Sequence, residues 1–178
     1  GVDLDGVVAN FTKGWTTLYE AEFGKKILEK DITEWGLSKP LTHFEEEIDF
    51  WKWAKDINGS SIFRNLDVYE DSLEVLYDLS KMGHEVVIIS SKPWWSIHDT
   101  LMWLGERKIP TKEIHFIEDK WKIECDVYID DAPYQLDNYI KNLKNKVIIR
   151  FVREYNDPVT GVLDLNEWKD LIPLLNSL

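Results

Sequence analysis

Short apolar runs that alternate with helical stripes constrain the fold of this 178-residue chain more than any other feature of its sequence. The runs Val86–Ile89, Val127–Ile129 and Val147–Ile149 are continuously apolar, which is typical of strands covered on both faces. Apolar residues recur at helical spacing elsewhere, as in the stretch Leu73–Met82. Strands that alternate with helices indicate a parallel sheet with right-handed crossovers. We therefore expect an α/β fold in which helices flank a parallel sheet.

The same patterns predict the remaining elements. A strand is expected at Ile114–Ile117, and the segment Gly1–Val8 is expected to be the end of a buried strand that enters a glycine turn. The other predicted helices are Phe11–Phe23, Thr100–Arg107, Tyr134–Leu143 and Asn166–Leu175.

A segment of different texture interrupts this pattern near the N-terminus. Residues 25–66 are polar and rich in tryptophan, and Gly36 and Gly59 break them into short pieces. A flexible linker would not carry so many large aromatic side chains, so we interpret the region as a small helical insertion. We expect a core of residues 1–13 and 67–178, with a helical cap of residues 14–66 inserted after the first strand.

The charge balance limits the partners of the protein. The sequence contains 33 acidic and 21 basic residues, for a formal net charge of −12. This excess of acid argues against partners that bind mainly through neutralisation of a phosphate backbone, as DNA and RNA polymers do. One small phosphate ester is compatible with it, because a few local donors and a metal ion are enough to hold such a group.

Cysteine content and hydropathy bear on the compartment. The single cysteine, Cys125, cannot form an internal disulfide, so nothing requires an oxidising environment. No apolar run approaches the roughly 20 residues of a membrane-spanning helix, and we expect no charged-then-apolar leader before the fold. We expect a cytoplasmic protein without a membrane partner.

Polar residues stand where the predicted strands end, which is where parallel sheets place their ligands. They comprise two acidic pairs, a hydroxyl pair and an amine, namely Asp3 and Asp5, Asp130 and Asp131, Ser90 and Ser91, and Lys120. Because the ends of neighbouring strands meet at one edge of the sheet, we expect these side chains to share one rim.

This set of side chains suits phosphoryl chemistry. Clustered carboxylates repel one another without a cation, so they predict a hard divalent ion, with Mg2+ as our first choice. Lysine and serine side chains neutralise and hydrogen-bond phosphate oxygens. A carboxylate in line with phosphorus can act as nucleophile and give an acyl-phosphate. A second carboxylate two residues further on can protonate the leaving oxygen and then activate water.

Plainer interpretations remain open for the same residues. Asp3 and Asp5 also suit an ordinary turn after a strand, while Asp130 and Asp131 suit the cap of a helix that starts near Pro133. The serines suit a loop, and the lysine suits a solvated surface.

Nine tryptophans are far more than packing alone requires in a chain of this size. Trp15 and Trp103 fall on helical stripes and are expected in the core. Two pairs, Trp51 with Trp53 and Trp94 with Trp95, either line a substrate cleft, where aromatic faces stack on bases, or pack between cap and core. We place Trp51 and Trp94 in the substrate pocket.

Four elements, in this order, resemble the motifs of the haloacid dehalogenase superfamily of phosphotransferases. The run Asp3–Val8 resembles the first motif, Val86–Ser90 the second, Lys120 the third and Tyr128–Asp131 the fourth. The resemblance extends from the first residue to about Val152. It implies a Rossmann-like parallel sheet with a cap inserted after the first strand.

Within the superfamily, the sequence is similar to the 5'(3')-deoxyribonucleotidases. The run Asp3–Phe11 matches their DxDGVxAxF opening, and Ser90–Ser91 resembles their Thr-Ser pair. Asp119–Lys120, followed after ten residues by Asp131, reproduces the spacing of their DK…IDD segment.

This resemblance implies a role for each rim residue. Asp3 would be the nucleophile and a metal ligand, while Asp5 would be the acid and base and would bind metal through its carbonyl. Asp131 would be the third protein ligand, with Asp130 supporting it through water. Phosphate would be held by Ser90, Ser91 and Lys120, and the nucleoside would lie against Phe11.

These observations predict a Mg2+-dependent phosphomonoesterase that acts through an aspartyl-phosphate, with a deoxyribonucleoside monophosphate as the first-choice substrate. A phosphatase for a sugar or cofactor phosphate is the main alternative. A phospho-acceptor signalling module or a silent nucleotide-binding protein would use similar residues. In receiver modules, however, the phosphorylated aspartate lies on a later strand than the acidic pair, whereas here the acidic pair follows the first strand.

Overall fold

Five short strands form a parallel sheet in the computed structural model, which describes residues 1–36 and 41–178. The strands are β1 (Val87–Ser90), β2 (Glu113–Phe116), β3 (Val127–Asp130), β4 (Val147–Phe151) and β5 (Leu163–Leu165). β1 pairs with β2, and β4 pairs with both β3 and β5, all in parallel. The prediction of a parallel α/β fold is confirmed. Residues 37–40, which belong to the expected cap, lie outside the described residues.

The N-terminal segment joins the two groups of strands into one sheet. Val2 forms parallel bridges to Ile88 of β1 and to Ile129 of β3. The spatial order is therefore β2, β1, the N-terminal segment, β3, β4 and β5. The segment leaves the sheet at Leu4, whose carbonyl accepts hydrogen bonds from the amides of Val7, Val8 and Ala9 in a tight turn. This order places the ends of the N-terminal segment, β1 and β3 side by side.

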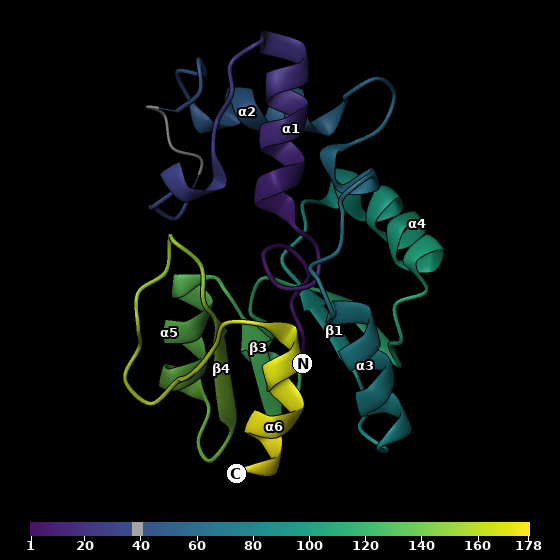
Figure 1. Cartoon of the computed structure of the whole chain (residues 1–178), viewed down its shortest axis with the longest axis vertical. Coiled ribbons are helices and arrows are strands. Elements are labelled where there is room, and N and C mark those ends of the chain that lie inside the picture. Colours follow the sequence, from purple (N-terminus) through teal and green to yellow (C-terminus); the bar gives the residue numbers. More distant parts are fainter. Residues whose placement is uncertain (37–40) are drawn as a thin grey trace.

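Helices lie on the sheet and above one end of it. The six α-helices among the described residues are α1 (Phe11–Phe23), α2 (Glu47–Lys55), α3 (Ser72–Lys81), α4 (Ile97–Arg107), α5 (Pro133–Asn142) and α6 (Leu171–Asn176). Figure 1 shows α1 and α2 at one end of the molecule and the sheet with α3, α5 and α6 at the other. The predicted helix Phe11–Phe23 is confirmed with the same bounds, because the Asn10 side chain accepts from the amide of Lys13 and Gly24 ends the helix in the left-handed conformation.

Two differences from the predicted elements arise near the C-terminus. Strand β5 is absent from the predicted elements, because a run of three residues with a polar centre is too short to stand out. The predicted helix Asn166–Leu175 is wrong in its first part: Trp168–Asp170 forms a 3-10 turn, and the α-helix starts only at Leu171.

A third difference lies in the middle of the chain. Helix α4 starts three residues before the predicted Thr100, after a 3-10 turn at Trp94–Ser96.

Buried tryptophans tie distant segments together. Trp15 and Trp103 are each only 2% exposed, as predicted for the core. The indole N–H of Trp103 donates to the Leu66 carbonyl at 2.7 Å. The indole N–H of Trp168 donates to the Val7 carbonyl at 2.8 Å. This hydrogen bond ties the turn after the N-terminal segment to the C-terminal part of the chain.

The expected cap region contains α2 and most of α1. Tyr19 and Phe23 of α1 pack against Phe44 and Trp53, with ring centroids within 6 Å of one another in each pair across the two groups. The boundary expected at residue 14 falls inside α1, so this helix runs from the sheet into the cap region. The division into core and cap remains a proposal. Among the described residues, no helix has the length and apolar character that crossing a membrane requires.

Candidate active site

Three carboxylates gather at the edge of the sheet where the N-terminal segment and β3 end. One oxygen each of Asp3, Asp130 and Asp131 lies within 4.8 Å of the others, and all three residues are buried. Burial raises the pKa of Asp131, and the nearby charges of Asp3 and Asp130 raise it further. Burial also raises the pKa of Asp130. Nearby positive charge would therefore stabilise the ionised forms of these buried carboxyl groups.

Lys120 supplies one such positive charge. Its Nζ lies 2.8 Å from Asp3 Oδ1 and 2.8 Å from Asp130 Oδ2, and the residue is 2% exposed. Burial alone would lower the pKa of Lys120, but the Asp130 and Asp3 carboxylates outweigh it and hold the pKa above its ordinary value. The ammonium is thus charged and lies next to both carboxylates.

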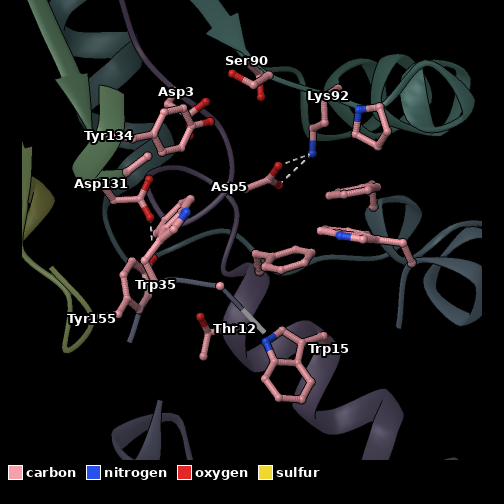
Figure 2. Close-up of a pocket in the computed structure, with 18 of the residues that line it drawn as sticks. Asp3, Asp5, Thr12, Trp15, Trp35, Ser90, Lys92, Asp131, Tyr134 and Tyr155 are labelled. Atoms are coloured by element: carbon pink, nitrogen blue, oxygen red, sulfur yellow. Dashed lines mark hydrogen bonds and ion pairs between the residues drawn. The ribbon is translucent and has the colours of Figure 1, made fainter. Parts of the chain in front are cut away.

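The Asp5 carboxylate lies apart from this cluster. Lys92 Nζ donates to both of its oxygens, at 2.7 and 2.5 Å (Figure 2). The same Nζ lies 3.6 Å from the centre of the Phe63 ring. Burial raises the pKa of Asp5, while the Lys92 ammonium opposes that shift. Sequence reasoning missed Lys92, although the residue follows Ser90 and Ser91 directly and the strand-end rule would include it.

The two serines lie at the end of β1, on the same cavity. Ser90 is 2% exposed, and Ser91 is half-buried. Gln135 Nε2 donates to Ser91 Oγ at 3.2 Å, so the hydroxyl of Ser91 is positioned from α5. Both serines line the cavity together with Asp3 and Lys120.

A cavity of about 620 Å³ extends from the carboxylates toward α1 and α2. Phe11, Trp51, Phe63 and Trp95 form one wall of it, which we call the aromatic wall. The Phe11 and Phe63 rings are stacked with centroids 5.5 Å apart, and the Phe11 and Trp51 rings are stacked at 6.3 Å. A flat ring system bound in this cavity would meet large aromatic faces.

The placement of Trp94 in the pocket is wrong. Its side chain is 78% exposed and does not line the cavity, and Lys55 Nζ lies 5.5 Å from its ring centre. The neighbouring Trp95 lines the cavity instead, because the 3-10 turn before α4 directs these two consecutive side chains to different sides. Sequence spacing alone does not predict which of the two consecutive tryptophans faces the cavity.

Tyr155 is a second residue that sequence reasoning missed. Its hydroxyl donates to Asp131 Oδ2 (Figure 2), and its ring centroid lies 5.4 Å from that of Trp35, which belongs to the expected cap region. The Asp131 Oδ1 atom is buried and has no hydrogen-bond partner among the described residues. Tyr155 lies beyond the part of the chain that resembles the family motifs, so no motif points to it.

Gly6 is required where these groups meet. Its φ is +81°, and a Cβ on it would lie 2.6 Å from Asp131 Cγ and 2.7 Å from the Tyr155 hydroxyl. We expect Gly6→Ala to lower turnover by about 100-fold or more, because it displaces a carboxylate of the site by roughly 1 Å. Phosphate release and the free energy of unfolding would be measured together.

The matched control for this substitution is Gly59→Ala. Gly59 has a similar φ of +88°, but a Cβ added to it would meet nothing within 4 Å. The Gly59→Ala variant should lose about 1–2 kcal/mol of unfolding free energy through backbone strain and keep its activity. Equal loss of activity in both variants would contradict the packing assigned to Gly6.

The cluster fits a divalent cation with oxygen ligands. The buried Asp131 Oδ1 lacks a partner among the described residues, and the three carboxylates outnumber the ammonium of Lys120. The Asp130 carboxylate is already engaged, since Oδ2 accepts from Lys120 and Tyr139 and Oδ1 accepts from the Ala132 amide. Asp3 and Asp131 therefore offer the free ligand oxygens, and Asp130 holds the ammonium beside them.

Comparison with solved structures agrees with this fold. The chain is similar in structure to a hydrolase of the haloacid dehalogenase family from Deinococcus radiodurans R1, which was crystallised with phosphate and sodium. The TM-score is 0.66 at 14% identity, and the match covers 99% of this chain and 93% of that one. The parallel α/β fold of this chain is thus similar to the fold of that hydrolase.

The family model described as "5' nucleotidase, deoxy (Pyrimidine), cytosolic type C protein" matches residues 1–177. The chain belongs to this family and is a phosphomonoesterase of the nucleotidase type. A 5'(3')-deoxyribonucleotidase of Clostridium acetobutylicum is 25% identical over all of this chain and 94% of its own length. A protein of Oceanobacillus iheyensis, named for an inferred nucleotidase activity, is 28% identical over 119 residues, which cover 62% of this chain and 62% of that protein.

Proposed function

We propose that this protein hydrolyses deoxyribonucleoside monophosphates to nucleoside and phosphate, with Mg2+ as cofactor and an aspartyl-phosphate on Asp3 as intermediate. The observation that carries the proposal is the placement of Asp3 beside Lys120 at the end of a cavity with an aromatic wall. One end of the cavity suits a phosphate, and the other suits a flat base. Its size suits a mononucleotide, not a polymer.

In the first step, an Asp3 carboxylate oxygen attacks phosphorus and the bond from phosphorus to the ester oxygen breaks. Protonated Asp5 gives its proton to the departing oxygen. In the second step, Asp5 accepts a proton from a water molecule that attacks phosphorus, and the bond to Asp3 breaks. Phosphate is then released and both carboxyl groups return to their starting states.

Other rim residues hold the transferring group. The Lys120 ammonium and the Ser90 and Ser91 hydroxyls bind the phosphate oxygens and neutralise charge in the transition state. The elevated pKa of Asp5 favours the protonated form that the first step requires. Lys92 pairs with the Asp5 carboxylate in the absence of substrate.

Asp3, Asp131 and the Asp5 carbonyl would hold Mg2+, with Asp130 in a supporting role. When bound, the cation would neutralise phosphate charge and balance the carboxylate cluster. The cap region would close the cavity against bulk water. A reducing compartment such as the cytoplasm suits the single free cysteine, Cys125.

Trp51 tests the role of the aromatic wall. We expect Trp51→Ala to raise KM for a deoxyribonucleoside monophosphate about tenfold or more, since stacking contributes about 1–3 kcal/mol per base. Inhibition by inorganic phosphate should not change, because phosphate does not reach this wall. Trp94→Ala is the matched control and should leave both constants unchanged. An unchanged KM in the Trp51 variant would show that the base binds elsewhere.

Substrate class is tested by one panel under identical conditions. Deoxyribonucleoside 5'- and 3'-monophosphates, ribonucleotides and sugar phosphates would each be assayed for phosphate release, with Mg2+ and with a chelator. We expect the highest kcat/KM for a deoxyribonucleotide and no release without the metal. A higher kcat/KM for a sugar phosphate would favour the non-nucleotide alternative.

A further inference from the structure

The loop after β4 holds the active-site turn and β3 together. Arg153 Nε donates to the Gly6 carbonyl at 2.7 Å, and Asn156 Nδ2 donates to the Asp131 carbonyl at 2.8 Å. Arg150 fixes the loop in turn, because its Nη1 donates to the Asn156 carbonyl at 2.6 Å. None of these contacts is part of the proposed reaction, yet the first two end at Gly6 and Asp131, beside the carboxylate cluster.

Tyr155, in the same loop, acts on the Asp131 side chain itself. Its hydroxyl donates to Oδ2, whereas Oδ1 is buried without a partner among the described residues (Figure 2). The missing Cβ of Gly6 leaves the room in which this hydrogen bond forms. Packing against Trp35 holds the tyrosine ring on its other side. Asp131 is thereby left with one oxygen engaged by protein and one oxygen available.

We propose that Tyr155 is a positioning residue that restricts Asp131 to coordination through one oxygen and so favours Mg2+ over Ca2+. This inference rests on the proposed metal site. Mg2+ requires near-octahedral geometry at about 2.0–2.1 Å and keeps several waters, which suits carboxylates that each give one oxygen. Ca2+ is larger and takes carboxylates through one or both oxygens at about 2.3–2.6 Å. Engagement of Oδ2 by Tyr155 removes the two-oxygen mode that would favour Ca2+.

The test is direct binding of Mg2+ and of Ca2+ to metal-free protein, without substrate. Calorimetry would give each Kd, and the metal-induced rise in Tm would be measured against each variant's own metal-free Tm. We expect wild-type protein to bind Mg2+ more tightly than Ca2+. Tyr155→Phe keeps the ring and removes one hydroxyl. It should weaken Mg2+ binding about tenfold or more, while Ca2+ binding is unchanged or tighter.

Tyr77→Phe is the matched control. The Tyr77 hydroxyl also donates a hydrogen bond, to the Lys108 carbonyl at 2.6 Å, but Tyr77 does not line the cavity. Its Mg2+ and Ca2+ constants should equal those of the wild type. A purely structural role for Tyr155 would lower Tm and leave the ratio of the two constants unchanged.

Three results would overturn the inference. Equal ratios of Mg2+ to Ca2+ affinity in wild type and Tyr155→Phe would remove the role of Tyr155 and leave the proposed function intact. Equal affinity of the wild-type protein for Ca2+ and Mg2+ would also exclude the proposed role of Tyr155 and leave the proposed function intact. Failure of the wild type to bind Mg2+ at all would overturn the proposed metal site together with this inference.

Discussion

Replacing Asp3 by Asn is expected to lower phosphate release by about 10⁴-fold or more, because the amide cannot form the acyl-phosphate bond. The fold should persist, since the substitution changes one atom and removes one of three clustered negative charges. We therefore expect a Tm equal to or above that of the metal-free wild type. Turnover of a deoxyribonucleoside monophosphate and thermal unfolding would be measured on the same preparations.

Asp119→Asn is the matched control for this substitution. Asp119 precedes Lys120 directly, but its side chain is 48% exposed and pairs with Lys122 on the surface. Its loss should change neither turnover nor stability by much, because exposed ion pairs contribute little. Robust turnover in the Asp3→Asn protein would contradict the assignment of the nucleophile.

The second large effect is expected for Lys120→Met. This change removes the ammonium that lies 2.8 Å from both Asp3 and Asp130 and leaves those carboxylates buried without compensation. We expect the metal-free protein to lose about 3–5 kcal/mol of unfolding free energy, as is typical when one partner of a buried ion pair is deleted. Turnover should fall by about 10³-fold, because a donor to the transferring phosphate is lost as well.

Denaturant unfolding of metal-free protein gives the stability change, and Lys122→Met provides the control. The Lys122 side chain is 52% exposed, so its loss should cost no more than about 0.5 kcal/mol. Similar stability losses for the two lysines would show that Lys120 does not balance the buried carboxylates. Unchanged turnover in Lys120→Met would separately contradict its role in phosphate binding.

The architecture could be predicted from local patterns because β1, β3 and β4 each contain a continuous apolar run. The run Val127–Ile129 and the stripe Leu73–Met82 correspond to β3 and α3 within a few residues. Strand β5 could not be predicted, since pairing with β4 stabilises it and nothing within its three residues does. The start of the last helix could not be predicted for the same reason. The indole of Trp168, just before it, donates a hydrogen bond to the carbonyl of Val7, which lies 161 residues away in sequence.

Residue types at strand ends indicated which chemistry to expect, but not how each side chain is paired. Asp3 and Asp5 are two residues apart, yet one faces Lys120 and the other faces Lys92. The sequence predicts a glycine turn at Gly6, but it does not predict the direction in which that turn points each of the two carboxylates. Tyr155 shows the same limit, because its partner Asp131 is brought to it only by the pairing of β3 with β4.

Transfer of the phosphoryl group to Asp3 is tested most directly by mass spectrometry of the enzyme, quenched in acid during turnover of a deoxyribonucleoside monophosphate with Mg2+. We expect part of the Asp3-containing peptide to carry one phosphoryl group, and this species to disappear once substrate is exhausted. The Asp3→Asn protein should never acquire it. Turnover that proceeds with the phosphoryl group on another residue, or with an active Asp3→Asn enzyme, would contradict the mechanism.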